Sequence, residues 1–217
     1  MLVKQRKAYV EGIAGGNLLL PKIIWDETTL IPTAVFNGTP VTCMFIGQGI
    51  KKIHKDLEEA LCKILKLDSA ALHSLSLKGL KEKMGDTTPG NNFSSYNRLM
   101  FRDLRVSVLE RLRSDPGFSH RTWLEWVDDL VGPLLTLVHL AAGMPGRSTE
   151  YPPLISFNDT GRQQRSVYIT MERLCFVFDY NKAQTQSGKS RVIPRFLDPK
   201  SSRLWAWFLG VVQPTYW

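Results

Sequence analysis

The alternation of hydrophobic and polar residues near the N-terminus predicts a small antiparallel hairpin. Residues 33–36 and 41–46 are rich in strand-favouring side chains, and Asn37-Gly38 between them is a strong signal for a two-residue hairpin turn. We expect a further strand near residues 22–25. Residues 1–16 lack such a pattern, and we expect them to be frayed.

Helical periodicity replaces this alternation further along the chain. Apolar residues recur at steps of three and four within residues 47–67 and again within 98–113, which predicts two amphipathic helices. The lysines of the first and the arginines of the second lie mostly off these apolar stripes. Such basic faces can meet DNA phosphates, but a charged helix face is more often simply solvated.

A third helix is predicted to begin near Ser119 or Thr122, where Thr122-x-x-Glu125 resembles a capping box. Gly132-Pro133 is expected to kink or break it. The segment that follows contains almost no polar residues, which predicts a helix buried on all sides. His139 within it is therefore interpreted as a core histidine satisfied by a neighbour.

Residues 68–97 are weakly patterned and end in a stretch rich in Gly, Pro and Asn, which is typical of a loop. This segment is the best candidate for a boundary between subregions. We expect residues 1–97 to hold the N-terminal hairpin and helices, and residues 98–217 to form a helical and α+β module.

Three short strands and a helix are predicted for the C-terminal part. The strands fall at residues 166–170, 174–180 and 191–197, with a polar turn at 181–190 between the last two. Asp198-Pro199 then starts a helix, with Asp as the cap and Pro at the first position. The fold class expected overall is a mainly helical α+β protein with a small antiparallel sheet near its C-terminus.

Composition adds a preference for polyanions. The formal net charge of +8 and the isoelectric point near 9.5 favour nucleic acid as a partner, although many basic proteins bind none. Three widely spaced cysteines argue against a disulfide framework and against a zinc finger. We expect no cofactor, no membrane span and no signal peptide, and we expect the protein in the nucleus or cytoplasm.

Two segments could bind phosphate. Arg147 and Glu150 share a face on one helical turn, so Glu150 can orient the guanidinium while Arg147 offers two donors. A local ion pair is the simpler interpretation of that spacing. Residues 183–190 loosely fit a nucleotide-binding loop, but Ala183 replaces its first glycine and the following strand-like residues include Pro194. Nucleotide binding is therefore not favoured.

The order of these C-terminal features resembles the opening half of the tyrosine recombinase catalytic domain. The likeness rests on Gly146-Arg147-x-x-Glu150, on strands with a lysine in the connecting turn, and on RVIPRFL before a helix. It implies that Arg147 binds the scissile phosphate, that Glu150 supports it, and that Lys182 is the general acid, with Lys189 as a second candidate.

Longer stretches resemble the region upstream of the helicase core in fungal telomere-linked, RecQ-like helicase proteins. They include IIWDETTLIPTAVFNGTPVT, AAGMPGRSTEYPPL and VIPRFLDPKSSRLWAWFLGVVQP. No helicase motif is present, and neither the His-x-x-Arg motif nor a nucleophilic tyrosine of a recombinase follows Lys182. We therefore expect a fragment or module that is catalytically incomplete alone, completed by a downstream helicase or recombinase segment.

These features together predict a DNA-binding module from a mobile-element or subtelomeric recombination or helicase system. Its expected contacts to backbone phosphate are Arg147, Lys182, Lys189, Arg191 and Arg195. The alternative is an interaction module or inert remnant that binds no DNA. That alternative expects an exposed surface at Trp205, Trp207 and Trp217, left without its partner.

Overall fold

The computed structural model describes residues 22–25, 32–36, 39–142, 156–159, 164–178 and 193–216. The chain divides into two compact units, Met1–Lys52 and Ile53–Trp217. Residues 68–97, where the sequence favours a boundary, lie within the second unit. Each unit is described by itself.

The first unit holds a three-stranded antiparallel sheet in the order β1-β2-β3. Its strands are β1 (Lys22–Trp25), β2 (Pro32–Phe36) and β3 (Thr39–Thr42). Thr33 pairs with Thr42 and Phe36 with Thr39, which confirms the predicted hairpin and its preceding strand.

The last strand of this hairpin was predicted to reach Ile46, and that part of the prediction is wrong. Helix α2 (Cys43–Leu65) begins directly after Thr42. Ile46 lies four residues before Ile50, so the apolar stripe of the predicted helix extends back into the strand-like run. An apolar run this short fits either the two-residue period of a strand or the 3.6-residue period of a helix.

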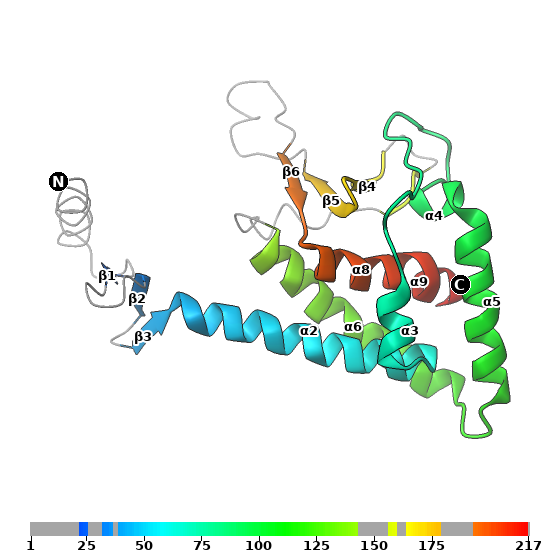
Figure 1. Ribbon diagram of the computed structural model, residues 1–217, viewed down its shortest axis with the longest axis horizontal. Helices are drawn as coiled ribbons and strands as arrows, with labels where there is room; N and C mark the ends of the chain where they lie inside the picture. Colours follow the sequence, from blue (N-terminus) through cyan, green and yellow to red (C-terminus); the bar gives the residue numbers. More distant parts are fainter. Residues whose placement is uncertain are drawn as a thin grey trace. The chain divides into compact units, whose positions relative to one another are not determined.

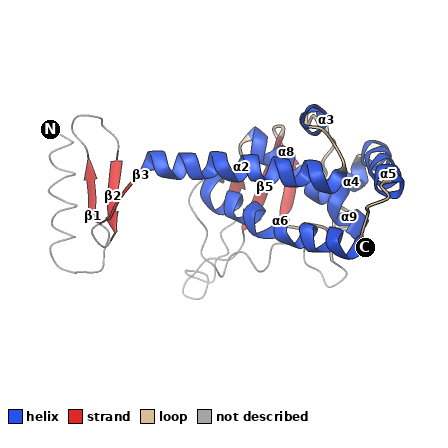
Figure 2. Cartoon of the chain, turned by 90° about the horizontal axis from the view of Figure 1, so that it is seen from below, coloured by secondary structure: helices blue, strands red, loops and turns tan. Residues whose placement is uncertain are grey.

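The second unit is mainly helical, as predicted (Figures 1 and 2). Its longer helices confirm the predicted starts at residue 98, after Ser119 and after Asp198. Ser119 accepts a hydrogen bond from the amide of Thr122, and Asp198 accepts from the amides of Lys200 and Ser201. Helix α2 belongs to this unit from Ile53 onward. The other helical elements are α3 (Ser69–Ser74), α4 (Phe93–Tyr96), α5 (Arg98–Ser114), α6 (His120–Ala141), α8 (Pro199–Trp207), the π-helical turn η2 (Phe208–Val212) and α9 (Gln213–Tyr216).

A second three-stranded antiparallel sheet, in the order β4-β5-β6, confirms the predicted C-terminal strands. They are β4 (Val167–Thr170), β5 (Arg173–Phe178) and β6 (Ile193–Phe196). Thr170 pairs with Arg173, and the two residues between them, Met171 and Glu172, have φ angles of 51° and 60°. Positive φ at both central residues is what a tight hairpin turn of this type requires.

The C-terminal helix lies in the core of the second unit. Helix α8 packs against β5 and α6, and η2 packs against α4 and α5 (Figure 1). The expected exposure of Trp205 and Trp207 is wrong, since they are 6% and 2% exposed. Their ring N–H groups donate to the carbonyls of Leu134 and Leu72 at 3.2 and 2.9 Å. Trp217 lies outside the described residues.

Helix α6 also departs from the prediction. It continues through Pro133, and it is buried on one face only, because Val131 and Leu140 are 39% and 40% exposed. Leu134 and Leu137 are fully buried on the other face. His139 is exposed, so its interpretation as a core histidine is wrong. The nearly continuous apolar run in this helix holds more apolar residues than its one packed face can bury, so some of them remain exposed.

A buried polar relay joins α2 to the start of α8. His54 Nε2 lies 2.7 Å from Ser201 Oγ, and the Ser201 hydroxyl donates to the Asp198 carboxylate. Because the hydroxyl proton points to Asp198, His54 Nε2 must carry the proton that it donates. Burial lowers the pKa of His54, while Asp198 and Glu58 raise it and Lys200 lowers it.

Acid is expected to destabilise the fold through His54. The pKa of His54 lies below 6.5 in the folded chain, so the unfolded chain binds more protons and stability falls as the pH drops below about 6.5. In thermal unfolding at pH 7.5 and 5.0, His54→Gln should lose less stability on acidification than the wild type. His120→Gln, at an exposed histidine, should behave as the wild type. Equal acid sensitivity of His54→Gln and the wild type would contradict this assignment.

Candidate anion-binding site

Most of the site residues predicted from the sequence lie outside the described part of the chain. These are Arg147, Glu150, Lys182, Lys189 and Arg191. Their predicted roles in phosphate binding and, by resemblance, in recombinase chemistry stay predictions.

Arg195 is the predicted contact that the structure describes. It lies on β6, opposite Phe176 of β5, and is 8% exposed. Its guanidinium lies over the ring of Phe178, 4.8 Å from the ring centroid. This side chain packs into the sheet, and its predicted phosphate contact stays a prediction.

A different pair of arginines lines a cavity of about 520 Å³ in the second unit. Arg98 and Arg105 come from α5, and seven residues place them on the same helix face two turns apart. Asn91, Ser95 and Gln213, whose side chains carry amide and hydroxyl groups, are among the other lining residues. No carboxylate is found among the described residues that line this cavity.

The two arginines differ in environment. Arg98 is exposed and makes no ion pair or hydrogen bond within the described residues. Arg105 is half-buried, and its Nη1 donates to the carbonyl of Gly210 at 3.1 Å. Burial lowers the pKa of Arg105, and the positive charge of Arg98 lowers it further. An anion bound between the two guanidiniums would stabilise the charged form of Arg105 against both its burial and the repulsion from Arg98.

The carbonyl of Gly210 that Arg105 contacts lies within the π-helical turn η2. Widening a helix to the π form displaces its regular hydrogen bonds, and such turns are frequent at functional sites. A Cβ at Gly210 would overlap the ring of Phe101, which is fully buried on α5. Glycine therefore permits the close approach that places the Gly210 carbonyl beside Arg105.

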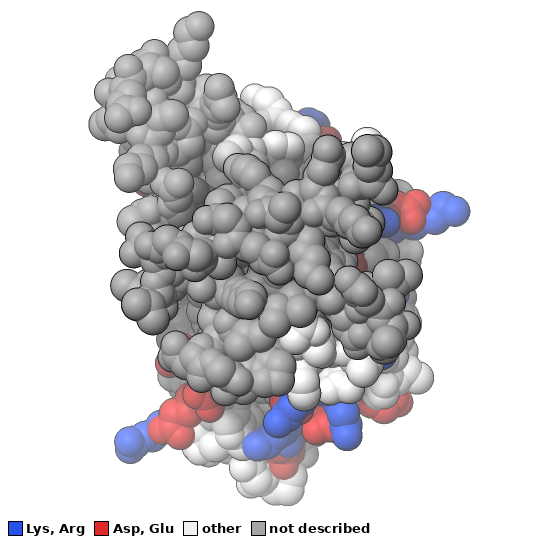
Figure 3. Space-filling view, turned by 90° about the vertical axis from the view of Figure 1, so that its left-hand side faces the viewer, with Lys and Arg blue, Asp and Glu red and all other residues white. Residues whose placement is uncertain are grey.

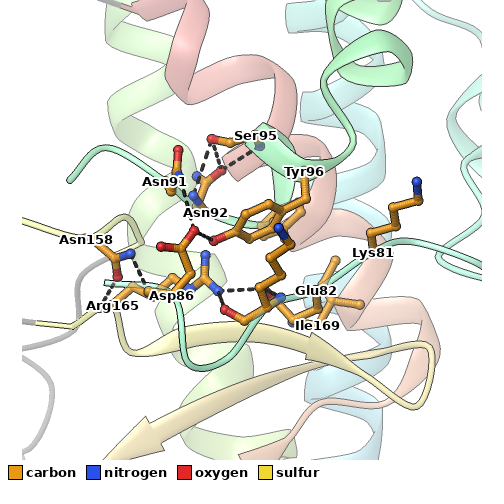
Figure 4. Close-up of polar contacts among 12 residues, drawn as sticks. Lys81, Glu82, Asp86, Asn91, Asn92, Ser95, Tyr96, Asn158, Arg165 and Ile169 are labelled. Carbon is orange, nitrogen blue, oxygen red and sulfur yellow. Dashed lines mark hydrogen bonds and ion pairs between the residues drawn. The ribbon is translucent and has the colours of Figure 1, made fainter. Parts of the chain in front are cut away.

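A buried arginine fixes the segment that forms one wall of this cavity (Figure 4). The Arg165 side chain is 0% exposed, and its Nη2 donates to Glu82 Oε1 at 2.6 Å and to the Lys83 carbonyl at 2.8 Å. Its guanidinium lies 5.3 and 4.8 Å from the ring centroids of Tyr96 and Tyr168. This contact ties residues 82–96 to β4.

Glu82 completes the tie to the sheet. Its second carboxylate oxygen accepts the backbone N–H of Ile169 at 2.9 Å, and its side chain is 8% exposed. One carboxylate thus holds both the guanidinium of Arg165 and a strand of the second sheet. A buried charge pair of this kind is stable only while both partners are present.

Asp86 organises the next part of the wall. It accepts hydrogen bonds from the Tyr96 hydroxyl and from Asn91 Nδ2, the latter at 3.1 Å. The hydrogen bond from the Thr88 side chain, followed by that from Tyr96, holds the pKa of Asp86 well below its usual range. Asp86 therefore stays ionised and keeps Asn91 in position.

Asn92 fixes the helical end of the wall. Its side chain accepts from the amides of Ser94 and Ser95, while the Ser95 hydroxyl accepts from the amide of Asn92. This reciprocal capping box closes the N-terminus of α4. The polar groups beside Arg98 are therefore held by the fold before any ligand binds.

Elsewhere, charges of opposite sign lie close together. Figure 3 shows blue and red side chains side by side in the described part of one face. Ion pairs join Lys66 to Asp115 at 2.7 Å and Arg121 to Glu125 at 3.3 Å. Local pairing of this kind weakens the long-range attraction of the surface for polyanions. These paired basic residues therefore differ from Arg98 and Arg105, whose cavity has no carboxylate among its described lining residues.

The Arg98–Arg105 cavity was not predicted from the sequence. The arginines of residues 98–113 were recognised only as a basic helix face. The seven-residue spacing of Arg98 and Arg105, which places them on the same side of the helix, was the signal that could have singled out this pair. Asn91 and Ser95, in a stretch whose composition is typical of a loop, gave no separate sign of a binding site.

Comparison with protein-family models, with curated protein sequences and with solved structures finds no match to this chain. Among the described residues, no helix combines the length and apolar character needed to cross a membrane.

Proposed function

We propose that this chain is a DNA-binding module that contacts backbone phosphates through the Arg98–Arg105 cavity. The observation that carries the proposal is the pair of arginines in a cavity with amide and hydroxyl groups and no carboxylate among its described lining residues. The proposed setting is a mobile-element or subtelomeric recombination or helicase system, as the resemblances imply.

Phosphate suits these groups chemically. A guanidinium offers parallel N–H donors that match two oxygens of a phosphate, and such charge-assisted hydrogen bonds are stronger than neutral ones. Arg105 is partly withdrawn from water, where an opposite charge interacts more strongly than at an open surface. The net charge of +8 adds attraction along the path of approach.

The contacts predicted from the sequence belong to the same proposal. Arg147 and Lys182 are proposed to extend the phosphate contacts beyond the cavity. The alternative of an interaction module that binds no DNA expects an exposed surface at Trp205, Trp207 and Trp217. Trp205 and Trp207 are buried, and Trp217 lies outside the described residues. DNA binding is therefore the function with more support.

Arg98→Ala is expected to weaken binding to a labelled DNA oligonucleotide about five- to tenfold, which is the loss of one charge-assisted contact at an exposed position. Arg98 is exposed and unpaired within the described residues, so the fold should be unaffected. Fluorescence anisotropy at constant salt measures the effect.

Arg102→Ala is the matched control, because Arg102 lies on the same helix and pairs with Asp103 at 2.9 Å. It removes the same charge and should change affinity less than twofold. Absence of DNA binding by the wild type, or equal effects of the two substitutions, would contradict the proposal.

A further inference from the structure

An exposed aromatic ring stands at the same cavity as the two arginines. Phe157 lines the cavity with Arg98 and Arg105, and it is 45% exposed. A phenylalanine with nearly half of its surface in water is not there for core packing alone. Its position beside two guanidiniums gives the cavity both a cationic and an aromatic wall.

Hydrogen bonds hold the residues on both sides of Phe157. The Asn158 amide donates to the carbonyl of Asn91 at 3.1 Å, and the Asn158 carbonyl accepts from the amide of Gly90 at 2.8 Å. On the other side, the Ser156 hydroxyl donates to Gln213 Oε1 at 3.2 Å. Phe157 thus lies between two hydrogen-bonded neighbours.

The side chain of Asn158 strengthens this arrangement. Its Nδ2 donates to the carbonyls of Asp86 and Thr88 at 2.7 and 3.1 Å, and its Oδ1 accepts from the amide of Arg165 at 3.1 Å. Asn158, the neighbour of Phe157 in the chain, therefore belongs to the same hydrogen-bonded network as the wall at residues 86–95 (Figure 4).

We propose that the cavity binds a nucleotide of single-stranded DNA, with a phosphate on Arg98 and Arg105 and the base stacked on Phe157. This inference rests on the proposed function and narrows its substrate. Every base has a π-face that can stack on an aromatic ring, whereas the bases of a duplex are already stacked on one another. The side-chain amides of Asn91 and Gln213 can hydrogen-bond to the edge of an unpaired base.

The volume of the cavity agrees with this ligand. At about 520 Å³ it falls in the range of about 300–1,000 Å³ that is common for small-ligand sites. A single phosphate would leave much of this space empty, including the aromatic wall. A nucleotide uses the charged and the aromatic walls together.

The test measures binding of one labelled oligonucleotide as a single strand and as a duplex. Phe157→Ala should weaken single-strand binding about five- to 100-fold, since stacking contributes strongly per base, and leave duplex binding within about twofold. Phe157→Trp should retain single-strand affinity. Phe118→Ala, which removes an exposed ring elsewhere in the second unit, should change neither.

An oligonucleotide with abasic sites gives a second readout that does not depend on folding of a variant. Wild-type protein should bind it at least as weakly as Phe157→Ala binds the intact strand, and Phe157→Ala should discriminate between the two strands less than the wild type does. These results would support stacking on Phe157.

Two failures are distinguishable. The first is that Phe157→Ala weakens single-strand and duplex binding equally, or changes neither of them, while Arg98→Ala weakens both. In that case stacking on Phe157 is wrong and phosphate binding stands. If the wild type binds neither form of DNA, the proposed function fails, and this inference fails with it.

Discussion

Arg165→Ala is expected to lower the free energy of unfolding by about 3–5 kcal/mol, the usual loss when one partner of a buried charge pair is removed. The side chain of Arg165 is 0% exposed and that of Glu82 is 8% exposed. Without the guanidinium, the Glu82 carboxylate would remain in the interior with the backbone amides of Lys83 and Ile169 as its described donors, and neither of them carries a compensating charge. The contacts with the Tyr96 and Tyr168 rings would also be lost.

Urea unfolding measures this loss, and Arg121→Ala is its control. Arg121 pairs with Glu125 at the surface, with 92% of its side chain exposed, so its removal should cost less than about 1 kcal/mol. Adding Glu82→Gln to Arg165→Ala should recover part of the stability, because it removes the orphaned charge. Similar losses for Arg165→Ala and Arg121→Ala would show that the buried pair does not hold the fold.

The double variant Arg98→Ala/Arg105→Gln is expected to bind DNA about 100-fold more weakly than the wild type. Each lost charge-assisted contact costs about 1.4 kcal/mol, or about tenfold in affinity. Glutamine at position 105 removes the charge but keeps an N–H donor for the Gly210 carbonyl, so the contact between α5 and η2 can persist. Anisotropy with the same oligonucleotide gives the affinity.

Arg111→Ala/Arg113→Ala is the matched control for the double variant. It also removes two positive charges, but from the exposed C-terminal end of the same helix. A loss of affinity as large as that of the cavity variant would attribute DNA binding to net charge rather than to the cavity.

Local signals in the sequence accounted for much of the fold. The strands at residues 22–25 and 167–178, the cap at Ser119 and the Asp198-Pro199 start depend on residues close together in the chain, and each was predicted. Turn residues, caps and periodicity act over a few positions, which is why they can be read without knowledge of the packing.

Burial was predicted less well because it depends on distant partners. The ring N–H of Trp207 is satisfied by the carbonyl of Leu72, 135 positions away, so nothing near Trp207 shows that it is buried. In α6, the apolar run from residue 134 suggested burial all round. Only the face that packs against neighbouring elements, including α8, is buried.

The candidate site shows the same limit. Arg165 and Glu82 are 83 positions apart, and Phe157 lines the same cavity as the arginines of α5, next to Asn158, which hydrogen-bonds to Asn91. The spacing of Arg98 and Arg105 could be read from the sequence, but their shared cavity could not. Residues 84–97 were predicted to be a loop, but they contain the short helix α4, and nothing in their sequence showed that they would become a fixed wall.

The dependence of DNA affinity on salt tests phosphate contact in the cavity most directly. A plot of log affinity against log salt concentration loses about 0.7–0.9 units of slope for each phosphate contact removed. Arg98→Ala/Arg105→Gln should therefore have a slope shallower than that of the wild type by about 0.7–0.9 units, because the two arginines are proposed to hold one phosphate. Equal slopes for the double variant and the wild type would contradict phosphate binding at this cavity.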